Sequence, residues 1–143
     1  MNVRKISLSI IVVAVSWFIV DSIVHGSILT GLYLSTAHLW RPLEEMSQIG
    51  HLIVLWVSAS LFVMFYQCMI KPKTLLQGLQ FGCWYGVAIG FGAACFYLYM
   101  PIPIELGLAW FVCNCLESVV AGLVVGYFLK DTDIAGETTC QKK

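Results

Sequence analysis

Charged side chains are scarce in this sequence of 143 residues, at 11% of the chain, with eight basic and eight acidic residues. A soluble domain typically has about 25% charged residues. So few charges cannot solubilise a chain that is 59% hydrophobic. The formal net charge is zero, so the basic surface that binds nucleic acid is also missing. The composition therefore predicts a protein whose main partner is the lipid bilayer, with no nucleic acid.

Short motifs that mark common active sites are missing as well. The sequence has no GxSxG nucleophile elbow, no phosphate-binding glycine loop, no HExxH and no paired CxxC. We therefore expect no enzyme and no cofactor, and metal binding stays open because acids and histidines occur without a metal-specific spacing. The cysteines avoid the predicted external loop, so no disulfide framework is expected and they are interpreted as small apolar filler. They are Cys68, Cys83, Cys95, Cys113, Cys115 and Cys140.

Four long apolar stretches dominate what is present. Each reaches the roughly 20 residues that a helix needs to cross about 30 Å of hydrocarbon. Strands are not expected, because no segment shows the strict alternation over about ten residues that is typical of a membrane barrel. We predict an all-α fold, an antiparallel bundle of four transmembrane helices over residues 1–130, followed by a flexible cytoplasmic tail over 131–143. The predicted spans cover residues 6–34, 49–70, 79–100 and 104–129.

The distribution of Lys and Arg predicts the orientation of these spans. Basic residues stand before the first span, between the second and third, and after the fourth, whereas the opposite side has only Arg41. The positive-inside rule then places both termini in the cytoplasm. On the external side, Pro42, Glu44 and Glu45 suit the first turn of a helix, so we expect a helix to begin near Pro42 and continue directly into the second span. The basic residues on the inner side are Arg4, Lys5, Lys71, Lys73, Lys130, Lys142 and Lys143.

Glycines recur at intervals of four in the third predicted span, and the fourth span repeats the spacing once. This pattern predicts a face of small residues along which two helix backbones approach closely. The face either packs inside one four-helix unit or joins copies of the chain, so a homo-oligomer or a larger membrane complex stays open. The glycines are Gly78, Gly82, Gly86 and Gly90 in the third span, and Gly122 and Gly126 in the fourth.

Ionisable residues interrupt the apolar runs. Asp21 and His25 lie four residues apart in "WFIVDSIVHGSIL" and therefore share one helix face. Glu117 and Asn114 stand near the centre of the fourth span, and His51 stands at the outer end of the second. A central acid opposes insertion by about 2.5–3.5 kcal/mol, and a hydrogen bond between membrane helices returns less than about 2 kcal/mol. We therefore predict a polar intramembrane site that handles a proton or a cation.

Two functions follow from these residues. In the first, the protein handles ions through the polar site. In the second, it is a non-catalytic accessory or assembly subunit of a membrane complex, and the polar residues only join its helices. The segments "LYLSTAHLWRP", "PIPIELGLAWF" and "ESVVAGLVVG" resemble a group of small bacterial four-span membrane proteins without an assigned activity. This resemblance, over most of residues 10–130, implies the four-span fold and the bacterial inner (cytoplasmic) membrane, and it implies no catalytic residue.

Overall fold

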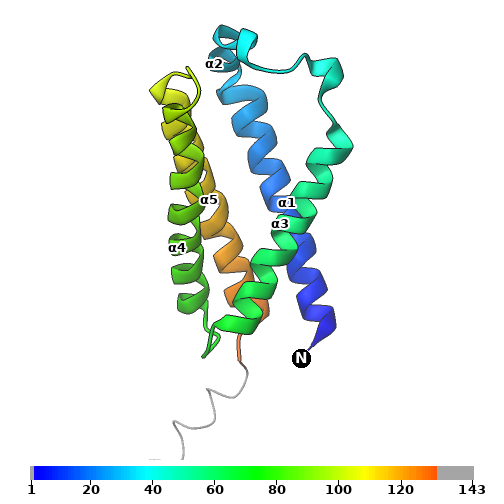
Figure 1. Ribbon diagram of the computed structural model, residues 1–143. Coiled ribbons are helices and arrows are strands. Elements are labelled where there is room, and N and C mark those ends of the chain that lie inside the picture. Colours follow the sequence, from blue (N-terminus) through cyan, green and yellow to red (C-terminus); the bar gives the residue numbers. More distant parts are fainter. Residues whose placement is uncertain (1, 132–143) are drawn as a thin grey trace, which may run out of the picture.

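The computed structural model describes residues 2–131, and this part of the chain is helical without any strand (Figure 1). Four helices are long and apolar enough to cross a membrane, which fits a small multi-pass membrane protein. The prediction of an all-helical fold with four such helices is confirmed. Cys140 and the predicted tail beyond Asp131 lie outside the described residues. The long helices are α1 (Val3–Ile23), α3 (Gln48–Met69), α4 (Leu75–Ala94) and α5 (Ile104–Phe128).

Three of the long helices begin at a polar residue that caps the first turn. The side chains of Asn2, Ser47 and Thr74 each accept a hydrogen bond from the backbone N–H three residues on, at 3.3, 3.0 and 3.1 Å. Such caps satisfy backbone donors that have no partner inside the helix. The capped residues mark where α1, α3 and α4 start.

The predicted helix from Pro42 into the second span is wrong. Residues Leu43–Glu45 form a single 3-10 turn, η3, and Ser47 then adopts an extended backbone with φ −79° and ψ 102°. An extended residue cannot continue a helix, so α3 starts only at Gln48, with Ser47 as its cap. The acidic residues after Pro42 therefore belong to the connection and not to a transmembrane helix.

The first span also differs from a single long helix. Beyond Ile23 the chain forms a π-helical turn, η1 (Val24–Ile28), in which the Leu29 N–H donates to the Val24 carbonyl at 2.8 Å. A separate short helix, α2 (Thr30–Ser35), follows. Turns of this type inside helices occur frequently at functional sites. Here η1 contains one predicted site residue, His25.

Helices α4 and α5 form the closest pair. A Cβ atom added to Gly78 would lie 2.6 Å from the Gly126 Cα, and one added to Gly86 would lie 2.9 Å from the Cys115 Cα. No side chain fits at such distances without moving a backbone. The predicted glycine face is therefore occupied inside the chain, by α5. Its members Gly78, Gly82, Gly86, Gly90, Gly122 and Gly126 are all buried.

Helices α1 and α3 cross near their middles, and α3 lies apart from α1 at the end of the molecule that carries α2 (Figure 1). Phe62 of α3 is fully buried, and its ring lies 5.7 Å from that of Trp17 on α1 and 4.9 Å from that of Tyr85 on α4. A second apolar cluster surrounds Leu29, which follows η1, and Leu106, near the start of α5. The core is therefore divided into two clusters, and Asp21 and Glu117 stand between them in sequence.

Candidate functional site

A cavity of about 260 Å³ lies among the four long helices, and each of them contributes to its wall. A volume of this size accommodates several water molecules. Its lining mixes apolar side chains with polar ones, which include four of the five residues predicted for the intramembrane site. These four are Asp21, His51, Asn114 and Glu117.

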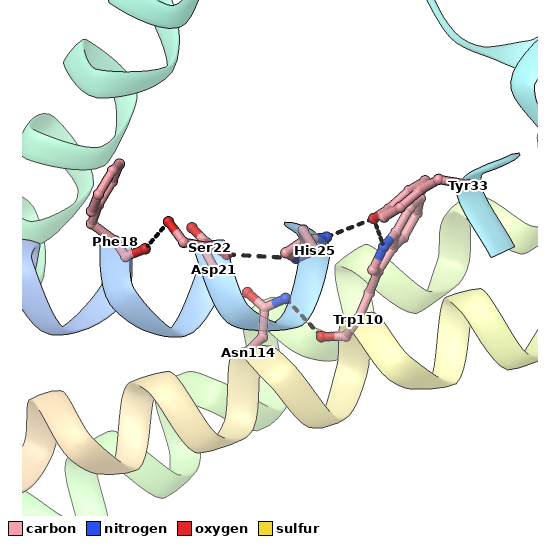
Figure 2. Close-up of polar contacts among 7 residues, drawn as sticks. All are labelled: Phe18, Asp21, Ser22, His25, Tyr33, Trp110 and Asn114. Atoms are coloured by element: carbon pink, nitrogen blue, oxygen red, sulfur yellow. Dashed lines mark hydrogen bonds and ion pairs between the residues drawn. The ribbon is translucent and has the colours of Figure 1, made fainter. Parts of the chain in front are cut away.

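The fifth residue, His25, reaches the cavity through Asp21. Its Nε2 atom lies 3.5 Å from the Asp21 Oδ1 atom, so the two side chains share one face of the helix as predicted. Both are only partly exposed, at 36% for His25 and 27% for Asp21. Figure 2 shows His25 between Asp21 on one side and Tyr33 on the other. The imidazole therefore links the acid to the short helix that follows the π turn.

A row of hydrogen bonds continues outward from His25. The His25 Nδ1 and Tyr33 hydroxyl lie 2.6 Å apart, and the Trp110 Nε1–H donates to the same hydroxyl at 2.8 Å (Figure 2). Burial raises the pKa of Tyr33 above its ordinary value of 10.0, while the hydrogen bond from Trp110 acts in the opposite direction. Tyr33 therefore stays a neutral phenol near neutral pH, with one proton to donate.

Two proton arrangements are compatible with this row. Trp110 can only donate, so the Tyr33 oxygen accepts from it in both. If Tyr33 donates to Nδ1, the proton of His25 is on Nε2 and points toward Asp21. If His25 carries its proton on Nδ1 and donates to Tyr33, Nε2 presents a free lone pair toward Asp21. The row can therefore supply the site with either a donor or a ligand.

Glu117 is the most isolated polar group of the cavity. Its Oε1 atom is buried and has no hydrogen-bond partner among the described residues. The Asp21 carboxyl lines the same cavity, and no Lys or Arg from the described part of the chain lines it. The Glu117 backbone is fixed, because its carbonyl accepts a hydrogen bond from the Trp17 Nε1–H at 2.9 Å. Two acids thus face one cavity without a strong base.

Asn114 and His51 contribute less to this constellation. The Asn114 side-chain amide donates to the Trp110 carbonyl one turn earlier, at 2.8 Å. His51 is exposed and reaches the cavity from α3, and no hydrogen bond within residues 2–131 joins it to the other predicted residues. Asp21, His25 and Glu117 therefore form the centre of the site, and the other two form its edge.

The sequence analysis did not assign Cys113 to the site, although its spacing from Glu117 indicates it. Asp21, His25 and Cys113 each offer one possible ligand atom, and these atoms lie within 4.8 Å of one another. Cys113 is buried, at 3% exposed, as expected for apolar filler. Its neighbours Asp21 and His25, however, are polar. Cys113 precedes Glu117 by four residues and so shares its helix face. That spacing is a signal available in the sequence.

Comparison of the chain with protein-family models, with curated proteins and with solved structures found no match. The resemblance to small bacterial four-span membrane proteins therefore stays a prediction, as does the bacterial inner membrane. What the site can do is set by the geometry of its own side chains.

Proposed function

We propose that this small multi-pass membrane protein handles a proton or a cation at the polar site formed by Asp21, His25 and Glu117. The main support for this proposal is that two carboxyl groups face one cavity without Lys or Arg among its described lining residues. An acid near the centre of a bilayer costs about 2.5–3.5 kcal/mol. A positive charge bound between the two acids offsets this cost through Coulomb attraction, which is strong in surroundings of low polarity.

We further propose an antiparallel arrangement with both termini on the cytoplasmic side. In Figure 1 the N-terminus, the α3–α4 connection and the end of α5 share one end of the molecule, and this end contains Lys71, Lys73 and Lys130. The positive-inside rule favours the cytoplasm for it. In a bacterial cell this would be the inner membrane. The row from Tyr33 to Asp21 then leads inward from the external side.

Replacement of Glu117 by Gln tests the proposal, because it removes the charge while the shape of the side chain is kept. The purified protein is reconstituted into liposomes that contain a pH-sensitive dye, and gradients of protons, Na⁺, K⁺ or Zn²⁺ are imposed. We expect a flux above that of empty liposomes for the wild type and none for Glu117→Gln. Circular dichroism and gel filtration check that the variant inserts and folds.

Glu105→Gln is the matched control. Glu105 is an exposed residue in the first turn of α5 and does not line the cavity, so the same substitution there leaves the flux unchanged. The proposal is wrong if the wild type carries no ion, or if Glu117→Gln retains the wild-type flux.

A second candidate function is an accessory or assembly subunit. The separation of α3 from α1 at the end that carries α2 favours it. The first half of α3 exposes large apolar side chains such as Ile49, Ile53 and Val54, and the glycine face of α4 is already occupied by α5. A second copy or a larger membrane partner would then bind along α3. In that case purification in mild detergent recovers a defined complex, and Glu117→Gln has little effect on its yield.

A further inference from the structure

We propose that Asp21, His25 and Cys113 bind one divalent transition-metal ion of the zinc class. The inference rests on the proposed function and deepens it, because it names the class of cation that the site takes. One ligand atom from each residue lies within 4.8 Å of the others. The ligands come from α1, from the π turn η1 and from α5, so an ion would join two helices that are far apart in sequence.

The chemistry of the three donors selects the ion. A carboxylate oxygen, an imidazole nitrogen and a thiolate sulfur are all ligands of Zn²⁺, whereas Mg²⁺ and Ca²⁺ take oxygen ligands only. Ligand atoms around a tetrahedral zinc ion lie about 3.5 Å apart, given metal–ligand bonds of about 2.0–2.3 Å. The His25 Nε2 and Asp21 Oδ1 atoms already have a separation of 3.5 Å. A small inward movement of the Cys113 side chain would complete the set.

The hydrogen bonds around His25 prepare it for this role. Its Nδ1 atom is engaged by the Tyr33 hydroxyl, and its Nε2 atom faces Asp21. Metal-binding histidines almost always use their second nitrogen in such a bond, which fixes the ring and the tautomer. With an ion on Nε2, the proton of His25 is on Nδ1 and is donated to Tyr33. Trp110 keeps the Tyr33 oxygen in place.

Charge balance also fits the site. The Asp21 carboxylate and the Cys113 thiolate together neutralise a 2+ ion, and the imidazole adds no charge, so the complex is neutral in apolar surroundings. On binding, the S–H bond of Cys113 breaks, a sulfur–metal bond forms, and the proton leaves through water in the cavity. A water molecule in the fourth position would donate to the Glu117 Oε1 atom, a buried acceptor without a partner among the described residues.

Cobalt titration tests the inference directly, because thiolate-bound Co²⁺ absorbs in the near ultraviolet. Metal-free, full-length protein in detergent is titrated with Co²⁺, which is then displaced with Zn²⁺. We expect one equivalent of Co²⁺ and a thiolate charge-transfer band, both reversed by Zn²⁺. Cys113→Ser loses the band, whereas the control Cys115→Ser, two residues away on the same helix, retains it. Tyr33→Phe keeps the band and weakens binding about 10–100-fold, as expected for a residue that orients a ligand.

A second measurement needs no variant at the site. Zn²⁺ should slow alkylation of Cys113 at least tenfold in the wild-type protein and leave the exposed Cys83 unaffected. The inference is overturned if no charge-transfer band forms, if Cys113→Ser binds Co²⁺ like the wild type, or if Zn²⁺ gives no protection. If these tests fail while Glu117→Gln still abolishes proton flux, only the metal assignment falls. If Co²⁺ binds but liposomes carry no flux, the metal site stands and the ion-handling function falls.

Discussion

The α4–α5 pair and the α1–α3 pair pack in opposite ways. In the α4–α5 pair, glycines bring backbone against backbone, and an added Cβ on Gly90 would lie 2.8 Å from the Phe111 carbonyl oxygen. In the α1–α3 pair, the Trp17 and Phe62 rings make contact where the two helices cross, and the helices separate toward the end that carries α2 (Figure 1). The cavity is lined by residues of all four long helices. One pair is close along its whole length and the other only in part.

The difference shows how one small bundle combines a fixed wall with an adaptable one. Close-packed interiors resist compression and transmit strain, so α5 holds Cys113 and Glu117 at set positions along α4. Asp21 stands on the α1 side of the cavity, and His25, which lies 3.5 Å from it, belongs to the π turn η1. A site that must admit and release an ion benefits from both properties.

The largest effect is expected where the aromatic contact is removed. Phe62→Ala empties a fully buried position and should lower the free energy of unfolding by about 3–5 kcal/mol, the usual cost of such a truncation. Thermal unfolding in detergent, followed by circular dichroism, measures it. Phe65→Ala on the same helix, where the side chain is 45% exposed, should have little effect. Equal destabilisation by both would contradict the proposed role of the aromatic contact.

The glycine pair should respond to an added side chain. A Cβ on Gly82 would lie 3.1 Å from the Gly122 Cα, so Gly82→Leu forces α4 and α5 apart and should cost about 3 kcal/mol. Gly92→Leu is the matched control on the same helix, because a Cβ there meets no described atom within 4 Å. Melting temperatures of the two variants compare them. Similar values would mean that the close approach of α4 and α5 does not stabilise the fold.

The smallest effect is expected at Tyr33, the residue of α2 that bonds His25. Tyr33→Phe removes the hydroxyl that bonds His25 and leaves the Trp110 N–H without its acceptor, at a cost of about 1–2 kcal/mol. The raised pKa of Tyr33 adds a pH dependence. Because the pKa of Tyr33 is higher in the folded protein, the unfolded chain releases the phenol proton at lower pH than the folded one. The contribution of Tyr33 to the free energy of unfolding is therefore present below about pH 10 and is lost as pH rises through the folded pKa.

The difference between wild type and Tyr33→Phe isolates this contribution from the other tyrosines. Denaturant or thermal unfolding at pH 8 and above pH 10 measures it, and the gap between the two proteins should narrow at high pH. A gap that widens with pH would mean that the folded protein favours the ionised phenol.

Hydropathy and spacing were sufficient for much of this fold. Lipid requires long apolar helices, so the four spans can be read from the sequence, and the i, i+4 rule correctly placed Asp21 beside His25 and the glycines on one face of α4. The break at Ser47 and the π turn at Val24–Ile28 could not be predicted, because each depends on local hydrogen bonds that several sequences permit.

Only those parts of the site that lie within a single helix could be predicted from the sequence. Asp21 with His25, and Cys113 with Glu117, are each pairs within one helix. The approach of the two pairs depends on how α1 packs on α5, and the bond from Tyr33 to His25 depends on how η1 joins α1 to α2. Packing of this kind leaves no periodic trace in the sequence.

The place of α5 between its neighbours has a consequence for biosynthesis. A chain grows from its N-terminus, so Asp21 reaches the translocation machinery while Glu117 has not yet been translated. The glycine face of α4 is likewise made before its counterpart. The last of the four long helices to leave the ribosome is thus the one that completes the interior, since it supplies both the backbone against which α4 rests and the acid that faces α1.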